Sequence, residues 1–269
     1  MSKRALPDRS IIRLSGPDML ALMERTVTNS VDNWNTGEMR YGALLTPQGK
    51  IIADYLAMLS LENIYLDVHS HAADELEKRL KLFRLRSEVE IDRLTDDVVT
   101  EGSWVDVRST SLPHRAISPA AEIGVEMSYE EWHKTRIAAG VPEWGADYRS
   151  SEVFPTDVNL DVMGGIDYKK GCFVGQEVAS RMKRKAKVRK RTLPVRGEGL
   201  KRGADILAGS SIGNVTSVSG EMGLALIRTD RMVQADAAGK AFTCGGRPVT
   251  IDRPEWLKME LIALTAAND

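Results

Sequence analysis

The chain has 269 residues, of which 42% are apolar and 28% charged, and its formal net charge is −1. This length and composition predict a globular protein with a substantial hydrophobic core and exclude low-complexity classes. No apolar run reaches the roughly 18 residues that span a bilayer, and the N-terminal residues lack the apolar segment of a secretory signal.

The first half of the chain predicts alternating strands and helices. A strand over 10–15 leads through Ser15, Gly16 and Pro17 into an amphipathic helix. The segment from 41 to 68 predicts consecutive strands separated by the turn TPQGK and the turn LEN. A helix is expected over 73–83, and short strands over 85–94 and 103–109.

The second half begins with clear helix signals and ends in a different pattern. Ser128 and Glu131 form a capping box, Gly140 is placed to end the helix, and Pro142 follows. Residues 143–161 predict an irregular segment. From about Leu193, short β segments alternate with Gly-rich turns, which is typical of a small β-barrel domain.

The chain holds two cysteines, Cys172 and Cys244, and four scattered histidines. This pattern indicates neither a disulfide framework nor a complete zinc site built by this chain alone. It favours a reducing compartment, which is the cytoplasm or, in a eukaryote, the mitochondrial matrix. Cys244, in the turn TCGGRP, is interpreted as structural.

Basic residues are concentrated in a short run over 181–191, which contains no acidic residue. The run therefore forms a local patch on an otherwise acidic chain, suited to an anionic partner. The alternative interpretation is a charged strand edge that prevents unwanted pairing. Its members are Arg181, Lys183, Arg184, Lys185, Lys187, Arg189, Lys190 and Arg191.

The motif KKGCFVGQE, over 169–177, combines two lysines, a thiol and two glycines. Ammonium groups near Cys172 favour the thiolate, so this cysteine is a candidate for chemistry. Gly171 and Gly175 permit backbone conformations closed to other residues. The alternative interpretation is a tight turn that carries a buried, unreactive cysteine.

KGCFVGQE, preceded by FPTDVNLDVMGGIDY and followed by ASR, resembles the signature of the YgfZ family. These are folate-binding proteins of iron–sulfur cluster assembly and repair, related in fold to the aminomethyltransferase (T-protein) of the glycine cleavage system. LSGPD, LTPQGKIIADYL, FRLRSEVEI and the C-terminal β segments fit the family in order, so the resemblance covers nearly the whole chain.

The resemblance implies an α+β, three-lobed, cloverleaf aminomethyltransferase-like fold with a small C-terminal β-barrel domain. Residues 1–190 would form the folate-binding region of two α+β lobes, residues 191–258 the barrel, and residues 259–269 a tail. Tetrahydrofolate, or a derivative, would lie in the central channel between the lobes.

The resemblance also implies the site residues. Asp54 occupies the place of a catalytic aspartate, and Tyr65 matches a tyrosine that packs beside the folate. Asp157 stands where relatives carry a glutamate that binds the pterin, one methylene longer. Lys170, Gly171 and Cys172 lie at the family's signature positions, with Cys172 and Asp54 as the catalytic candidates and no resident metal.

Three functions remain open from the sequence. The first is a tetrahydrofolate-binding accessory factor for iron–sulfur proteins, with a transient cluster shared with a partner protein because one chain has too few thiols. The second is a folate-dependent aminomethyl transferase. The third is RNA binding by the basic run, which is disfavoured because no aromatic residues are interleaved with its charges. That run would instead suit the polyglutamate chain of cellular folates.

Overall fold

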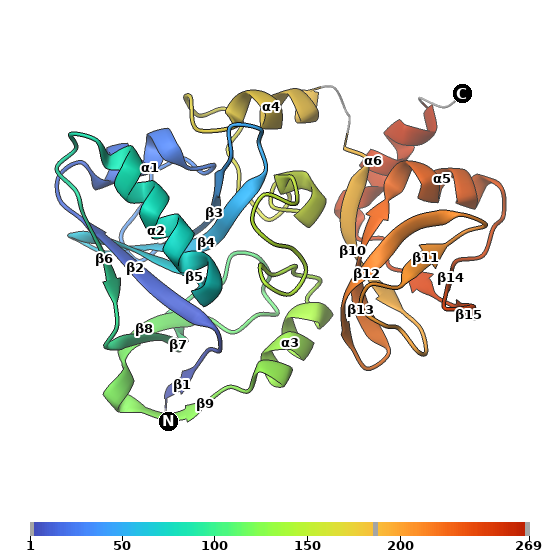
Figure 1. Cartoon of the computed structure of the whole chain (residues 1–269), viewed down its shortest axis with the longest axis horizontal. Coiled ribbons are helices and arrows are strands. Elements are labelled where there is room, and N and C mark those ends of the chain that lie inside the picture. Colours follow the sequence, from blue (N-terminus) through green and yellow to red (C-terminus); the bar gives the residue numbers. More distant parts are fainter. Residues whose placement is uncertain (1–2, 185–187, 267–269) are drawn as a thin grey trace.

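The computed structural model describes residues 3–184 and 188–266, and its core consists of three β-sheets with helices packed on them (Figure 1). Each sheet organises one lobe, and the chain completes the first two before it crosses to the third. No helix in the described part of the chain is long and apolar enough to cross a membrane.

The first lobe is built on a five-stranded antiparallel sheet. One face is apolar, and the helices α1 (Met19–Thr26) and α2 (Ser70–Arg84) cover it with buried side chains such as Leu22 and Leu76. The strand order is β3 (Met39–Leu45), β4 (Ile51–Leu59), β5 (Asn63–His69), β2 (Arg9–Ser15) and β6 (Glu90–Leu94).

The second lobe is built on a four-stranded sheet with β1 inside it. Its order is β8 (Arg115–Pro119), β7 (Asp97–Trp104), β1 (Lys3–Ala5) and β9 (Ile123–Glu126), and a 3₁₀ turn η1 (Ala120–Glu122) precedes β9. Helix α3 (Tyr129–Ala138) follows, and the Ser128 hydroxyl caps it by accepting a hydrogen bond from the Glu131 N–H at 3.1 Å. The expected helix start is therefore confirmed.

The third lobe is a strongly curved seven-stranded sheet with its own core, centred on Leu193, Ile206, Val215 and Ile227. The helices α5 (Thr229–Ala237) and α6 (Glu255–Ala266) pack against each other on it. The residues expected as a tail after 258 thus remain helical as far as Ala266. Its order is β15 (Arg247–Pro248), β14 (Thr243–Cys244), β11 (Asp205–Leu207), β12 (Ser211–Ser219), β13 (Met222–Arg228), β10 (Lys190–Arg196) and β16 (Thr250–Ile251).

The expected α+β class with a C-terminal β-barrel domain is confirmed, but two local predictions are wrong. The strand expected over 103–109 ends at Trp104, because Asp106 and Arg108 turn inward to form a buried ion pair. The first part of the basic run is not a strand edge but continues the helix α4 (Gln176–Arg184). Lys185 and Lys187 lie outside the described residues.

Candidate functional site

The candidate site begins on the second face of the five-stranded sheet, which points toward the middle of the molecule. Side chains alternate between the two faces of a strand, and directly paired residues share a face. Tyr65 pairs with Met58 and Asp67 pairs with Leu56, so both lie on the same face as Asp54. A polar face therefore lies behind the apolar face that α1 and α2 cover.

Asp54 is buried on this face and contacts tyrosines. The Tyr41 hydroxyl donates a hydrogen bond to Asp54 Oδ2 at 2.9 Å, and the residue is only 7% exposed. Burial, together with the Asp54 carboxylate, raises the pKa of Tyr41 and of Tyr148 well above the usual value. Both phenols are therefore neutral donors, and the buried Tyr148 hydroxyl lies close enough to Asp54 for that carboxylate to act on it.

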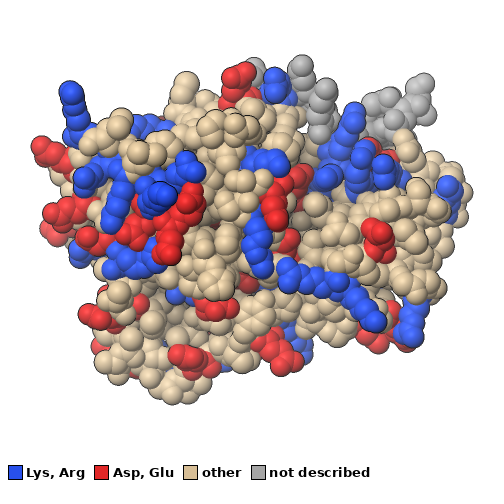
Figure 2. All heavy atoms as spheres, viewed as in Figure 1, with Lys and Arg blue, Asp and Glu red and all other residues tan. Residues whose placement is uncertain are grey.

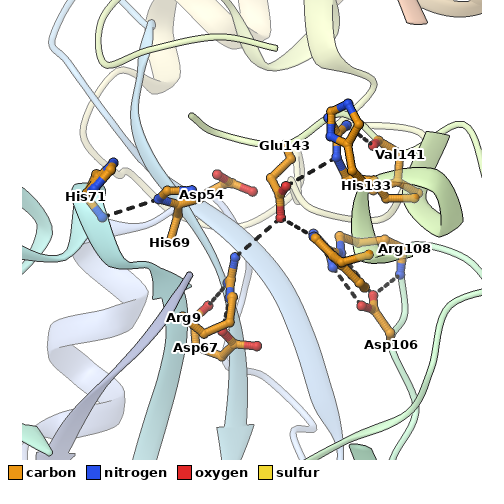
Figure 3. A network of polar contacts seen from close by, with 12 residues as sticks. Arg9, Asp54, Asp67, His69, His71, Asp106, Arg108, His133, Val141 and Glu143 are labelled. Carbon is orange, nitrogen blue, oxygen red and sulfur yellow. Dashed lines mark hydrogen bonds and ion pairs between the residues drawn. The ribbon is translucent and has the colours of Figure 1, made fainter. Parts of the chain in front are cut away.

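A chain of buried ion pairs runs beside Asp54 (Figure 3). Asp67 forms ion pairs with both Arg9 and Arg115. Arg115 Nε also lies 2.9 Å from Asp106. Arg108 donates two hydrogen bonds to the same Asp106 carboxylate. Burial alone would raise the pKa of Asp106, but the positive charges of Arg108 and Arg115 hold that pKa below its usual value. These charges therefore stay ionised and fix the connection after β7.

This charge network continues to the C-terminal lobe. Arg136 Nη1 donates to Asp147 at 2.6 Å, and its Nη2 donates to the Ser217 hydroxyl on β12 at 2.8 Å. The neighbouring Thr216 hydroxyl donates to Asp147 at 2.5 Å. The Arg136 side chain is fully buried, so charged groups, rather than only apolar contacts, join the lobes here.

His69 lies on the same inner face and is held neutral. Its ring packs 5.3 Å from Trp144, and its Nδ1 accepts a hydrogen bond from the His71 N–H. Burial first, and then the nearby Arg9 charge, lowers the pKa of His69 to about 4. Near neutral pH it therefore adds no positive charge to the site.

The motif loop presents Cys172 at the surface. Its thiol is free and exposed, whereas Cys244 is buried in the C-terminal lobe. The loop packs closely against the turn between β3 and β4. The approach is so close that a Cβ on Gly175 would lie 2.6 Å from the Thr46 carbonyl oxygen. An added Cβ on Gly171 meets no atom within 4 Å, so only Gly175 is required by packing.

Lys170 points away from the surface, toward the end of α1. Its ammonium group donates to the carbonyl oxygens of Val27 at 2.9 Å and Asn29 at 2.6 Å, and Glu24 lies 3.5 Å away. These three partners match the three donors of an ammonium group. Lys170 therefore ties the motif loop to α1 through contacts within the protein.

Asp157 lies in the 3₁₀ turn η2 (Pro155–Val158) and closes that turn. Its Oδ2 accepts a hydrogen bond from the Phe154 N–H at 3.0 Å, and burial raises the pKa of its carboxyl group. Its second carboxylate oxygen makes no hydrogen bond within the described residues. One carboxylate oxygen of Asp157 is therefore already hydrogen-bonded within its own turn.

The six predicted site residues occupy three places rather than one contact cluster. Asp54 and Tyr65 share the inner face, Asp157 closes η2, and Lys170, Gly171 and Cys172 form the motif loop. Within the described part of the chain, no hydrogen bond or ion pair joins any two of them. Sequence reasoning missed Tyr41, Tyr148, Arg108 and Arg136, which surround Asp54 or extend its network.

The basic run is only partly available to a ligand. Arg181, Lys183, Arg189 and Lys190 are exposed, and the Lys183 ammonium lies 4.7 Å from the Tyr168 ring centre. Arg191 is buried and pairs with Asp161 and Glu260, so it joins β10 to α6. Elsewhere on the face in Figure 2, basic and acidic side chains are interspersed over α2, where Arg93 binds both Asp74 and Glu77.

Comparison with known proteins gives one match to a family model and several to complete sequences. Residues 189–259 match the model described as the CAF17 C-terminal beta-barrel domain. The barrel assignment therefore rests on both the sequence match and the observed sheet. As a separate point, no group of three or more histidine, cysteine or acidic residues in the described part of the chain could hold a metal ion.

Two similar sequences share the name "Iron-sulfur cluster assembly factor IBA57 homolog, mitochondrial". The one from Mycosarcoma maydis is 30% identical over 224 residues, covering 71% of this chain and 56% of its own length. The one from Neurospora crassa is 28% identical over 231 residues, covering 70% and 52%. The matched region thus spans about half the length of these relatives.

A solved structure resembles the whole fold. The aminomethyltransferase T of the glycine cleavage system from Bartonella henselae superposes with a TM-score of 0.73, covering 94% of this chain and 86% of that one, at 14% identity. The human iron–sulfur cluster assembly factor IBA57, mitochondrial, is 25% identical over 275 residues, covering 84% of this chain and 77% of its own. The chain is therefore similar in sequence to proteins named as iron–sulfur cluster assembly factors, and it has the aminomethyltransferase fold.

Proposed function

We propose that this protein is a tetrahydrofolate-binding accessory factor for the assembly, maturation or repair of iron–sulfur proteins, with Cys172 as its working thiol. The observation that carries the proposal is the similarity to relatives named as iron–sulfur cluster assembly factors over most of this chain. The exposed thiol of Cys172, on a loop that packs closely at Gly175, agrees with this role. The proposed role is assistance rather than turnover.

The inner face offers groups that suit a folate. A pterin edge presents N–H donors and a carbonyl acceptor, and the Asp54 carboxylate and the neutral hydroxyls of Tyr41 and Tyr148 offer a complementary acceptor and donors. Asp54, Tyr65, Asp157, Lys170, Gly171 and Cys172 are the residues that the family resemblance would place around the ligand. Tetrahydrofolate itself would supply reducing or one-carbon chemistry, and Asp54 would accept a proton or orient a donor.

The cluster role requires a second protein. Two cysteines in separate lobes, one of them buried, are too few for a cluster held by four thiolates. Cys172 is exposed, so it can supply one ligand to a cluster shared with an assembly or client protein. The relatives are named as mitochondrial, so in a eukaryote the place of action would be the mitochondrial matrix; in a bacterium it would be the cytoplasm.

Folate-dependent aminomethyl transfer remains the second candidate because Asp54 is buried and hydrogen-bonded by Tyr41 on an aminomethyltransferase fold. The two functions differ in what they require of the thiol. A transferase would turn over an aminomethyl-lipoyl carrier without Cys172. An accessory factor would not turn over that carrier. It would need Cys172 to restore the activity of an iron–sulfur enzyme in cells whose own assembly factor of this kind has been deleted.

The first experiment is calorimetric titration of the reduced protein with tetrahydrofolate, in the wild type and in Asp54→Asn, Cys172→Ala and Asp92→Asn variants. Saturable binding that weakens about tenfold in Asp54→Asn, the loss of one charge-assisted contact, would support the proposed site. Asp92→Asn is the matched control, because Asp92 is a half-exposed strand carboxylate paired with Arg13. Absence of binding in the wild type would refute the folate part of the proposal.

The polyglutamate partner is tested with the same method. Arg181, Lys183, Arg189 and Lys190 are the exposed described members of the basic run, so they are the ones that can meet an anionic chain. At low salt, polyglutamated folate should bind more tightly than the monoglutamate, and Lys183→Ala with Lys190→Ala should reduce that difference. Equal affinity for the two folates would rule out this role of the run.

A further inference from the structure

An open groove of about 680 Å³ lies between the helix α1 and the turn that joins α2 to β6. It is lined by Asp18, Arg25, Leu85, Arg86 and Ser87, and none of the six predicted site residues belongs to it. The turn lies at the end of the first lobe that points away from the C-terminal lobe (Figure 1). The groove therefore belongs to a surface that the proposed function leaves unused.

Leu85 occupies a backbone conformation that ordinarily favours glycine. Its φ is 51° and its ψ is −112°, and the Ser87 N–H donates to the Arg84 carbonyl oxygen at 2.9 Å across it. These are the angles of the first central residue of a type II′ turn, where a side chain is strained. Leu85 is 81% exposed, so burial in the core does not explain a leucine here. Strained residues of this kind are typical of functional positions.

Hydrogen bonds from α1 hold the turn in place. Arg25 Nη2 donates to the Ser87 hydroxyl at 2.7 Å and reaches two carbonyl oxygens of the turn at 3.3 and 3.4 Å. At the other end of α1, the Asp18 carboxylate accepts a hydrogen bond from the Glu88 N–H at 2.9 Å. Because the backbone is fastened on both sides, the turn presents Leu85 to solvent in a fixed position.

The groove also carries positive charge that lacks an acidic partner. Arg86 makes no side-chain hydrogen bond or ion pair within the described residues, and Arg25 makes none through Nε or Nη1. By contrast, Lys81 on the same helix is paired with Glu77. The lining holds two arginines and one aspartate, Asp18, so its net charge is +1. Its free N–H groups suit carboxylates.

The neighbouring side chains indicate which kind of partner fits. Leu82 stands three positions before Leu85 on α2 and is 62% exposed, so the two leucines form a small apolar surface beside the arginines. Glu88 and Glu90 are exposed on the same turn and the start of β6, and they would repel an anionic bilayer. A narrow protein segment can reach the arginines and avoid these acids.

We propose that this groove binds a short acidic segment of a partner protein. Carboxylates of that segment accept hydrogen bonds from Arg25 and Arg86, and one of its apolar side chains packs on Leu82 and Leu85. The strained conformation of Leu85 is retained because it places the leucine at this contact. The proposal goes beyond the proposed function, since it requires neither tetrahydrofolate nor the thiol of Cys172.

The test is titration of the full chain with a hexapeptide of glutamate and leucine residues, followed by the NMR signals of the leucine methyl groups and of the Ser87 amide. The signals of Leu82, Leu85 and Ser87 should shift and saturate. A peptide with lysine in place of glutamate should bind about tenfold more weakly, because it meets like charges. No saturable shift at these residues, or equal binding of the two peptides, would overturn the proposal.

Three variants establish the contacts. Arg86→Glu should weaken binding of the acidic peptide about tenfold, whereas Arg247→Glu, at an exposed arginine of the C-terminal lobe, should leave it unchanged. Leu85→Gly should raise the temperature of unfolding, because glycine accepts this conformation, and yet weaken binding about fivefold. Unchanged binding in Arg86→Glu or in Leu85→Gly would overturn the proposed contacts, whatever the stability of the variant.

Other occupants are tested in parallel. Sedimentation with phosphatidylcholine–phosphatidylserine vesicles tests a membrane, and light scattering of the protein alone tests a second copy of the chain. Vesicle binding or a dimer that is lost in Arg86→Glu would assign the groove to that occupant and overturn the proposal. Cys172→Ala should bind the acidic peptide like the wild type, and a loss of binding there would contradict the independence of the groove from the proposed function.

Discussion

The two cysteines have opposite surroundings, and their reactivity should differ accordingly. Cys172 is exposed on the motif loop, whereas Cys244 is 2% exposed within the core of the C-terminal lobe. Reaction with a thiol reagent requires access as well as the thiolate. One thiol per chain should react rapidly in the native protein, and a second only after unfolding, as measured by release of a coloured thiolate.

The control for this prediction is Cys172→Ala. The variant should lose the rapid phase and keep the slow one, while Cys244→Ala should show the reverse. A rapid phase that survives in Cys172→Ala would mean that the C-terminal lobe opens readily in solution.

Lys170 should stabilise the folded protein through the hydrogen bonds of its ammonium group. Its ammonium group binds two carbonyl oxygens and lies near Glu24, so Lys170→Ala leaves buried acceptors without donors. Hydrogen bonds to charged groups contribute about 1.5–3 kcal/mol, so we expect a loss of about 2 kcal/mol in the free energy of unfolding. Urea denaturation would measure it.

The adjacent Lys169 is the matched control, since its side chain is exposed. Lys169→Ala should change the free energy of unfolding by less than about 0.5 kcal/mol. Equal effects of the two substitutions would contradict the contacts assigned to Lys170. The same comparison shows whether any folate-binding defect in Lys170→Ala reflects lost folding.

His69 should make the protein less stable as the pH falls from about 6.5 to 4. Its pKa in the folded protein is about 4, below the ordinary 6.5, so the unfolded chain binds the proton first. Stability is therefore complete above the ordinary pKa and is lost as the pH falls toward the folded one. The free energy of unfolding should vary less with pH in His69→Asn than in the wild type.

His133 also has a lowered pKa, caused by burial and by Arg136, so part of the slope should remain in the His69 variant. Urea unfolding at several pH values between 4 and 7 would separate the two contributions. Identical slopes for the wild type and His69→Asn would show that folding does not lower the pKa of His69.

At the scale of elements, the motif loop should tolerate change at one glycine and resist it at the other. Gly175 has φ +82° and would place a Cβ 2.6 Å from a backbone oxygen of the β3–β4 turn. Gly171 has open space around its Cα. Gly175→Ala should therefore lower the free energy of unfolding by about 1–3 kcal/mol, and Gly171→Ala should change it little.

The measurement pairs thermal unfolding with the rate of Cys172 labelling. In Gly175→Ala the loop should move and the labelling rate should change, whereas Gly171→Ala should label like the wild type. Unchanged labelling in both variants would mean that the contact with the turn does not position the thiol.

Sequence alternation could predict part of the site but not its connections. Asp54, Tyr65 and Asp67 stand at alternate positions in strands, so a shared polar face could have been recognised from IIADYL and IYLDV. Asp106 and Arg108, by contrast, looked like strand residues because they alternate with Val105 and Val107. Their mutual ion pair depends on a fold that local patterns do not contain.

At the scale of the molecule, Arg136 is one of the buried charged side chains that connect the lobes. It binds Asp147 and Glu143 and reaches Ser217 of the C-terminal sheet from a fully buried position. Removing one partner of a buried ion pair typically costs about 3–5 kcal/mol. Arg136→Leu should therefore lower the free energy of unfolding by that amount and separate the unfolding transitions of the lobes.

Arg196→Leu is the matched control, because Arg196 pairs with Asp252 at the surface and such pairs contribute about 0–1 kcal/mol. Denaturation followed by far-ultraviolet circular dichroism and by tryptophan fluorescence would detect separate transitions. Coincident transitions of wild-type stability in Arg136→Leu would show that the contacts of Arg136 are not needed to join the lobes.

The C-terminal β domain was predictable because the β pattern changes at about Leu193, which lies in the strand β10 of the third sheet, whereas the three-lobed class was implied by the family resemblance. The strand pairing of the second lobe was not predictable from local patterns, because its sheet joins β1 to β7 and β9, more than ninety positions later. Pairing over such distances leaves little local signal. The helix α4 was hidden for another reason, since its charges resembled a solvent-exposed patch.

The place of β1 also has a consequence for synthesis on the ribosome. This strand lies between β7 and β9, so it cannot acquire both neighbours until residue 126 has left the exit tunnel. The five-stranded sheet, complete at Leu94, can form earlier and hold the nascent N-terminal segment nearby through β2. A vectorial order of assembly is thus built into the topology, since β1 is paired on both sides only after the strands of the five-stranded sheet have all been synthesised.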